Sequence, residues 1–218
     1  MEQMPRHQCL IYDGSPSRML PAIAAHIKEK LSENIRCLYL NSPTMVAGLR
    51  SYLFAAGVDV PYEVAKGSLV LSSDHSHLKD GHFDPDHILN MLEDTMNQAL
   101  SDGYLGLWAT GDMTWELGPD KSPEKLLEYE WRLEELFQKY TTISGICQYH
   151  VDTLPGEVVC QCMQRHPALF INETLTRINP HYIPTDEPVQ QAAPTPELEQ
   201  MVHDLCAMQP GKDVERGV

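Results

Sequence analysis

Basic residues are scarce in this chain of 218 residues. Lys and Arg total 16 whereas Asp and Glu total 31, so the formal net charge is -15 at pH 7. A protein with a large negative net charge repels the phosphate backbone of nucleic acids and the headgroups of anionic lipids. We therefore expect no direct binding to nucleic acid and no association with a membrane surface.

Long apolar runs and disulfide-type cysteine density are also missing. No stretch approaches the ~20 apolar residues of a membrane-spanning helix, and MEQMPRHQ at the N-terminus is not a signal peptide. We expect a cytoplasmic protein.

The six cysteines do not make a disulfide scaffold in a chain of this length. Cys9, Cys37 and Cys147 lie within apolar runs, so we interpret them as small buried side chains; a redox sensor built on these thiols is a weaker alternative.

A phosphate-binding loop is the third absence. The segment YDGSPSRML after the first apolar run has one glycine and no lysine, and Pro16 removes a backbone donor, so it does not fit GxxxxGK[ST]. Without that lysine and the magnesium-binding hydroxyl, phosphoryl transfer loses its main electrostatic support. We expect no ATP hydrolysis, no catalytic residue and no cofactor.

Short apolar runs that alternate with segments of helical period are what the sequence does contain. Continuous apolar runs are typical of strands buried on both faces of a sheet, and alternation with helices predicts βαβ units. We therefore expect an α/β fold, a three-layer αβα sandwich with a mainly parallel sheet and some antiparallel pairing near its C-terminal end. The runs span residues 8–12, 36–40, 68–72, 105–110, 143–149 and 168–171, and the helices about 20–31, 43–56, 85–99 and 122–139, with a fifth after Thr153.

The composition changes after about residue 176. We place the domain at residues 5–176, followed by a Pro-rich extended linker at 177–196, because proline propagates neither a helix nor a central strand. Apolar residues at helical spacing predict a short amphipathic helix over 197–208, and a disordered tail completes the chain at 209–218. So short a helix must dock, either on its own domain or on another chain.

Two acidic residues are candidates for a functional site. Asp112 ends the run GLWATGD, which suits either a magnesium-binding carboxylate or a turn with a self-capping side chain. Glu130 lies among Leu126, Leu133 and Phe137 on one helical face. It is either a flank residue that reaches solvent or a pocket acid with a raised pKa.

No metal site is expected from the histidines and cysteines. His75, His77, His82 and His87 with Asp84 do not have the spacing of a compact helical pair of ligands. On a helix, Cys160 and Cys162 would point about 200° apart and could not share one ion. His7 is interpreted as a residue that forms hydrogen bonds at a strand end.

Several motifs, in order, resemble the MEDS domain, the methanogen/methylotroph DcmR sensory domain. The resemblance covers about residues 5–184, and ordered motifs at consistent spacing are more specific than any one of them. The motifs are HQCLIYD, AAGVDV, LKDGHFDPDHIL, GYLGLWATGDMTWEL, LLEYEWRLEELF, CQYH, HPALFI and NPHYIP.

The resemblance implies a RecA/KaiC-like fold whose nucleotide site has been put to another use, without a functional P-loop. It also implies a non-enzymatic sensor of a small organic molecule, such as a hydrocarbon derivative, at the C-terminal ends of the strands. Because no DNA-binding or kinase segment flanks the domain, the signal would pass through a partner protein such as a histidine kinase or a transcription regulator, and a homo-oligomer stays open. The matching positions predict a ligand site formed by His7, Tyr12, Asp13, Gly111, Asp112, Met113, Trp115, Glu130 and Tyr149. The alternative is a residual nucleotide-binding or hydrolytic enzyme that uses Asp112 and Glu130.

Overall fold

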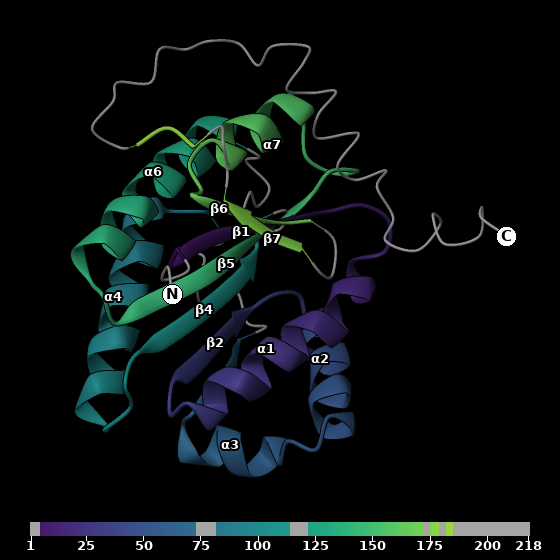
Figure 1. The fold of residues 1–218 in the computed structure, drawn as a ribbon, viewed down its shortest axis with the longest axis vertical. Helices are drawn as coiled ribbons and strands as arrows, with labels where there is room; N and C mark the ends of the chain where they lie inside the picture. The colour runs from purple at the N-terminus through teal and green to yellow at the C-terminus, as the bar shows by residue number, and fades with distance from the viewer. Residues whose placement is uncertain (1–4, 73–81, 114–121, 172–174, 179–181, 185–218) are drawn as a thin grey trace, which may run out of the picture.

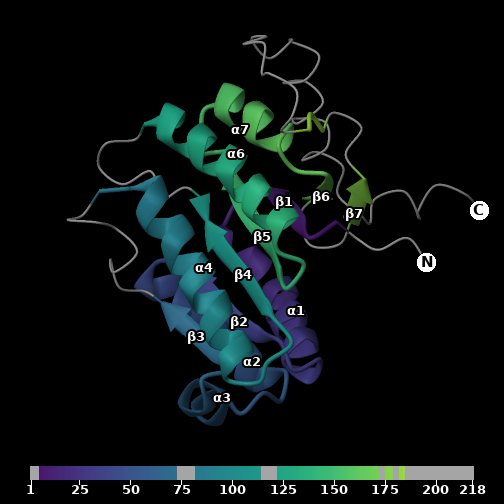
Figure 2. The same ribbon diagram turned by 90° about the vertical axis from the view of Figure 1, so that its left-hand side faces the viewer.

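The computed structural model shows a twisted β-sheet covered by helices on both faces (Figure 1). It describes residues 5–72, 82–113, 122–171, 175–178 and 182–184. Viewed from the side, the helices α4, α6 and α7 lie on one face and α1 and α2 on the other (Figure 2). The molecule is therefore an α/β sandwich of three layers, as the alternating pattern predicts.

In these residues the strands form one sheet of seven in the order β3-β2-β4-β5-β1-β6-β7. Every neighbouring pair is parallel except β6 and β7, which are antiparallel. The strands are β1 (His7–Tyr12), β2 (Arg36–Leu40), β3 (Leu69–Ser72), β4 (Leu107–Asp112), β5 (Ile143–His150), β6 (Ala168–Ile171) and β7 (Leu175–Ile178).

The helices begin at the positions where the sequence carries start signals. Ser42, Asp59, Asp84 and Ser122 each accept a hydrogen bond from a backbone N–H of the first turn, and a proline follows within the first two helical positions. The helices are α1 (Leu20–Ser32), α2 (Pro43–Ala55), α3 (Val60–Lys66), α4 (Pro85–Ser101), α6 (Pro123–Lys139) and α7 (Gly156–Met163), and a 3-10 helix η1 (Pro16–Met19) precedes α1.

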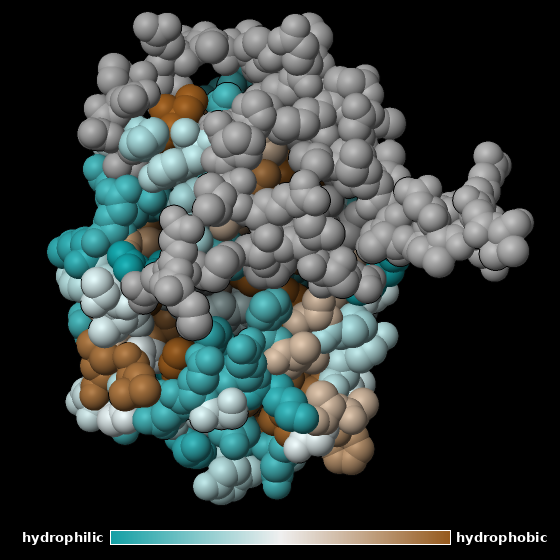
Figure 3. All heavy atoms as spheres, viewed as in Figure 1, coloured by the Kyte–Doolittle hydropathy of each residue, from teal (hydrophilic) through white to brown (hydrophobic). Residues whose placement is uncertain are grey.

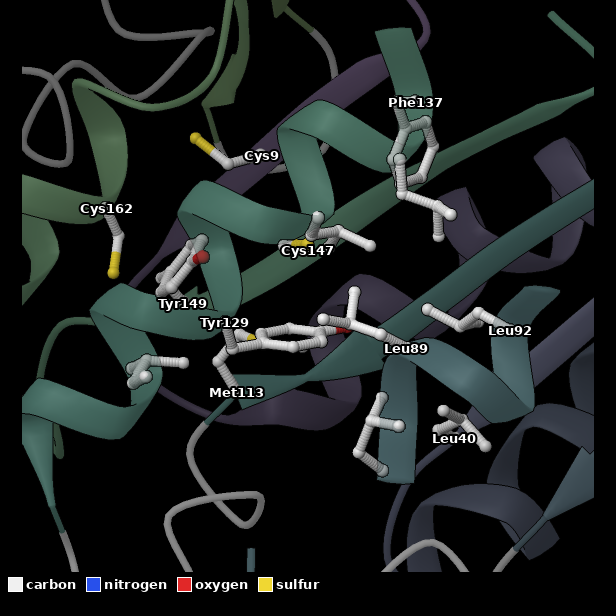
Figure 4. Packing of buried hydrophobic residues seen from close by; sticks show 14 of the residues in the cluster. Cys9, Leu40, Leu89, Leu92, Met113, Tyr129, Phe137, Cys147, Tyr149 and Cys162 are labelled. Atoms are coloured by element: carbon white, nitrogen blue, oxygen red, sulfur yellow. The ribbon is translucent and has the colours of Figure 1, made fainter. Parts of the chain in front are cut away.

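Two apolar cores fill the sandwich, one on each face of the sheet. The larger core packs α4, α6 and α7 against the sheet, and Figure 4 shows Met113, Cys147 and Tyr149 within this layer. The second core packs α1 and α2 against the opposite face and contains Tyr12 and Tyr39. Neighbouring residues of a strand thus enter different cores, because successive side chains alternate across a sheet.

The predicted strands and the five predicted helices are present, with ends shifted by a few residues. The helix α3 was not predicted, because seven residues are too few for an apolar stripe, although Asp59 and Pro61 are a start signal. The sheet also continues through β7, which crosses the boundary placed at residue 176. Ile183 donates its backbone N–H to Gln164 O at 2.8 Å, so packing against the domain extends into the segment assigned to the linker. The predicted helix at 197–208, the tail at 209–218 and the linker from residue 185 lie outside the described residues.

The visible surface is mostly hydrophilic where the structure describes it (Figure 3). Hydrophobic residues show as separate patches in this view. Among the large hydrophobic side chains of the described residues, Phe54, Leu105 and Tyr62 are the most exposed. None of the described helices combines the length and the apolar character that crossing a membrane requires. Among the described residues no cysteine forms a disulfide, and Cys9, Cys37 and Cys147 are buried, as expected. Cys160 and Cys162 are buried as well.

Candidate functional site

The residues of the predicted ligand site are divided between the two faces of the sheet, because successive side chains of a strand point to opposite faces. Tyr12 lies in the core under α1 and α2, and its hydroxyl donates to Asp112 Oδ2 at 3.0 Å. Met113 and Tyr149 lie in the core under α4, α6 and α7. Glu130 on α6 enters that same layer. The side chains of the predicted site are therefore divided between two cores, with Tyr12 in one and Met113 and Tyr149 in the other.

Tyr12 and Asp112 form a hydrogen-bonded pair where β1 and β4 end. Asp112 is buried at the end of β4. The turn that would follow it lies outside the described residues, so the interpretation as a self-capping turn residue stays a prediction. Burial, followed by the charge of Asp112, raises the pKa of Tyr12 far above its usual value. The tyrosine thus remains a neutral donor that holds the carboxylate.

His7 is the centre of a polar cluster on the opposite face. Its side chain is buried, it stacks on Phe137 with ring centroids 4.8 Å apart, and its Nδ1 lies 2.7 Å from Glu134 Oε2. Glu134 Oε1 also accepts bonds from Tyr182 Oη at 2.8 Å and Gln138 Nε2 at 3.0 Å. Burial acts to raise the pKa of Glu134, but the hydrogen bonds from His7, Tyr182 and Gln138 outweigh it and hold that pKa below its ordinary value.

Glu130 lies deeper in the same cluster and is 0% exposed, so the interpretation as a flank residue that reaches solvent is wrong. Its Oε2 lies 3.6 Å from His7 Nε2 and 3.3 Å from His166 Nε2. Burial raises the pKa of Glu130 to about 7, opposed by His7 and by the nearby Tyr149 hydroxyl and Cys147 thiol. The raised pKa agrees with the burial of this acid, whereas its predicted place in a ligand pocket stays a prediction.

Cys147 and His166 complete the cluster, and neither was among the predicted site residues. Cys147 Sγ lies 3.6 Å from His7 Nε2. His166 tilts against His7 with ring centroids 4.0 Å apart and meets Tyr149 edge-on at 5.7 Å. Cys147 could have been found from the sequence, because it stands two residues before Tyr149 and so faces the same side of its strand. His166 lies between α7 and β6, where no spacing signal places it.

A hollow of about 290 Å³ opens beside His7 at the outer end of the cluster. It lies near the amino ends of β1 and β6, whereas the predicted site was at the carboxyl ends of the strands. The residues that line it are Pro5, Arg6, His7, Glu134, Phe137, Gln138, Pro167 and Tyr182. Its volume is just below the range of ~300–1,000 Å³ that is typical of small-molecule sites.

The remaining predicted residues are placed elsewhere. Asp13 is partly exposed, with one oxygen 4.0 Å from Arg18 Nη1. Gly111 pairs through its backbone with β2 and β5 and contributes no side chain. Trp115 lies outside the described residues, so its role as a wall of the pocket stays a prediction. The same holds for the ligand-binding role of every residue in the set.

The loop histidines are only partly described. His75 and His77 fall outside the described residues, and Asp84 caps α4 by accepting the backbone N–H of His87. Cys160 and Cys162 lie on α7, two residues apart and both buried. The described residues that bring ligating atoms together are therefore those of the His7 cluster, not the histidines of the loop.

Comparison with known proteins identifies the family of this chain. Residues 6–167 match the family model described as MEDS, the methanogen/methylotroph, DcmR sensory domain. The chain belongs to the MEDS family. The transcriptional repressor DcmR of Methylorubrum extorquens (strain DSM 6343 / CIP 106787 / DM4) is 25% identical over 160 residues. That alignment covers 73% of this chain but 57% of the repressor, so the chain spans somewhat over half the length of this relative. The family model is thus that of a sensory domain.

Glu130→Gln tests whether the buried carboxylate of this MEDS domain is costly. In protein treated with a chelator, the variant is expected to be ~1–3 kcal/mol more stable, because Gln keeps the shape while the desolvated charge is removed. Urea unfolding at neutral pH measures the difference. Glu128→Gln on the same helix is the control, since Glu128 is exposed and its pair with Arg132 should change stability by less than ~1 kcal/mol. A destabilised Glu130→Gln would show that the carboxylate is fully compensated.

Proposed function

We propose that this MEDS domain is a non-enzymatic sensor that binds a small organic molecule, such as a hydrocarbon derivative, in the hollow beside His7. The observation that carries this proposal is the continuity between the hollow and the buried cluster. His7 and Glu134 line the hollow and also contact the charged interior around Glu130. A ligand in the hollow would therefore act on residues that join several elements of the fold.

The apolar and polar parts of the hollow suit a small ligand with one polar group. Phe137 and the two prolines offer apolar contact, while Glu134, Gln138 and Tyr182 offer hydrogen bonds. Such a ligand would compete with Tyr182 for Glu134. Since Tyr182 and Ile183 hold the segment 182–184 on the domain, this competition is a route from ligand binding to the chain that follows.

We propose that the signal passes to a partner protein, a histidine kinase or a transcription regulator, inside the cytoplasm. The transcriptional repressor among the relatives supports a regulatory output. We also propose a RecA/KaiC-like origin for the fold, supported by Asp112 at the end of β4 and by the parallel sheet. We do not favour the alternative of a residual nucleotide-binding or hydrolytic enzyme, because Asp112 and Glu130 lie on opposite faces of the sheet.

Thermal unfolding in the presence of short-chain alcohols, aldehydes, carboxylates and halogenated hydrocarbons tests the sensor function. At least one class should raise the melting temperature progressively, with the logarithm of ligand concentration above the Kd, without turnover of the ligand. Tyr182→Ala should abolish that rise, because it removes one wall of the hollow. Tyr62→Ala is the matched control, since Tyr62 is an exposed tyrosine on α3 and should leave the response intact. Turnover of a stabilising compound, or an equal response in Tyr182→Ala, would contradict the proposal.

A further inference from the structure

Four side chains with metal-ligating atoms converge inside the larger core. They are His7, Glu130, Cys147 and His166, all of them buried, and their ligating atoms lie within 4.8 Å of one another. The separations include 3.3 Å from His166 Nε2 to Glu130 Oε2 and 3.6 Å from His7 Nε2 to both Glu130 Oε2 and Cys147 Sγ. Ligands bound at about 2.0–2.3 Å to a tetrahedral ion lie about 3.3–3.8 Å apart. The cluster is therefore close to the size of a tetrahedral site.

Both histidines are held in the orientation that metal ligands require. The Nδ1 of His166 lies 2.8 Å from the Cys162 carbonyl oxygen, which can only accept, so Nδ1 carries the hydrogen. The Nδ1 of His7 lies 2.7 Å from the Glu134 carboxylate and donates in the same way. In the neutral rings the lone pairs are then on Nε2, which faces Glu130 in both cases. A carboxylate or carbonyl behind each imidazole is the usual outer shell of a metal-bound histidine.

The carboxylate of Glu130 is poorly compensated at this position. It is fully buried, and neither of its oxygens makes a hydrogen bond of good geometry among the described residues. The Nδ1 of His166 is already bound to the Cys162 carbonyl oxygen, so the ring presents Nε2 to Glu130 Oε2 at 3.3 Å. Two lone-pair atoms 3.3 Å apart in a core repel each other unless a proton or a metal ion lies between them.

We propose that His7, Glu130, Cys147 and His166 bind one four-coordinate transition-metal ion, with Zn²⁺ as the best fit. Imidazole, thiolate and carboxylate are the ligands that Zn²⁺ takes in proteins, whereas Ca²⁺ and Mg²⁺ require six or more oxygens. On binding, Cys147 releases its proton to solvent and enters as the thiolate. The two anionic ligands then balance the charge of the ion, which makes the site neutral in the core.

The ion would act as a clamp, because its four ligands come from distant parts of the chain. They lie on β1, α6, β5 and the turn before β6. With every position of a tetrahedral ion filled by protein, the site is closed in the manner of a structural site. Its position under the hollow would fix His7 in place. The proposal stands on these contacts alone and does not depend on the sensor function.

Metal titration of the full-length protein tests the site. After removal of metals with a chelator, one equivalent of Co²⁺ should give visible bands of tetrahedral cobalt and a near-ultraviolet band from thiolate bonding. One equivalent of Zn²⁺ should displace the cobalt and raise the melting temperature by ~5–10 °C. Binding of less than a tenth of an equivalent, or octahedral cobalt bands alone, would overturn the proposal and leave a shared proton in the cluster.

Two cysteine variants decide where the ion binds. Cys147→Ala should lose the thiolate band and bind Zn²⁺ at least ~100-fold more weakly. Cys37→Ala is the matched control, because Cys37 is an equally buried thiol in the core on the other face and should retain the band. A band that persists in Cys147→Ala would place the ion elsewhere and overturn the proposal.

X-ray absorption at the zinc edge needs no variant, so it decides the question even if Cys147→Ala does not fold. The expected first shell is one sulfur at about 2.3 Å and three nitrogen or oxygen atoms at about 2.0–2.1 Å. Two or more sulfurs, or none, would overturn the assignment of these four ligands.

Discussion

His7→Ala is expected to lower the free energy of unfolding by ~3–5 kcal/mol, more than any other single change in the polar cluster. The substitution removes a buried ring that stacks on Phe137 and takes the hydrogen-bond partner from Glu134. It also leaves two buried carboxylates facing each other across the vacated space, and an uncompensated buried charge is strongly destabilising. Urea unfolding of the chelator-treated protein measures the loss.

A double-mutant cycle separates lost packing from lost charge compensation. In a Glu130→Gln background, His7→Ala should lower the free energy of unfolding by ~1–2 kcal/mol less, because one of the two uncompensated carboxylates has been removed. His26→Ala is the control for loss of a histidine, since His26 lies on α1 away from the cluster, and it should cost less than ~1 kcal/mol. Equal costs of His7→Ala in both backgrounds would mean that His7 acts through packing alone.

Gly145→Ala is the second change with a large expected effect, ~3 kcal/mol or more of lost stability. Gly145 lies in β5 between Ala109 of β4 and His7 of β1, and an added Cβ would overlap the Ala109 carbonyl oxygen. The atom in the way is backbone, so the central strands must separate to admit the methyl group. The displacement would reach His7 directly.

Gly156→Ala provides the matched control for Gly145→Ala. Gly156 begins α7, and an added Cβ there meets nothing within 4 Å. Alanine is the better helix former, so this variant should be unchanged or more stable by up to ~1 kcal/mol. Thermal and urea unfolding of the two variants compare them directly. Similar losses in both would show that glycine is not required by the close approach of β4 and β5.

The order of strands and helices could be predicted because local signals agree with the fold. Apolar runs such as 36–40 and 143–149 lack alternation, which is the pattern of a strand covered on both faces. Ser42 and Asp84, each before a proline, mark helix starts that the structure confirms. The helix α3 and the extent of β7 are short, so periodicity had too few residues to reveal them.

The candidate site could be predicted only in part, for a reason that strand geometry explains. Glu130 was found because helical spacing places it on the inner face of its helix. His7 and Tyr12 were assigned to one pocket although they are five positions apart on a strand, which puts them on opposite faces. His166 opens the motif HPALFI, but its approach to His7 and Glu130 depends on how α7 packs, which no local pattern reveals.

The most direct test of the sensing site is a crystal structure of the full-length protein purified from its native cells. Unbiased electron density should show a small organic molecule in the hollow, in contact with Phe137 and within hydrogen-bond distance of Glu134 or Tyr182. The cluster of His7, Glu130 and Glu134 should remain buried directly beneath it. A hollow filled by the protein's own side chains, with a ligand bound instead between Tyr12 and Asp112 on the other face of the sheet, would contradict the account.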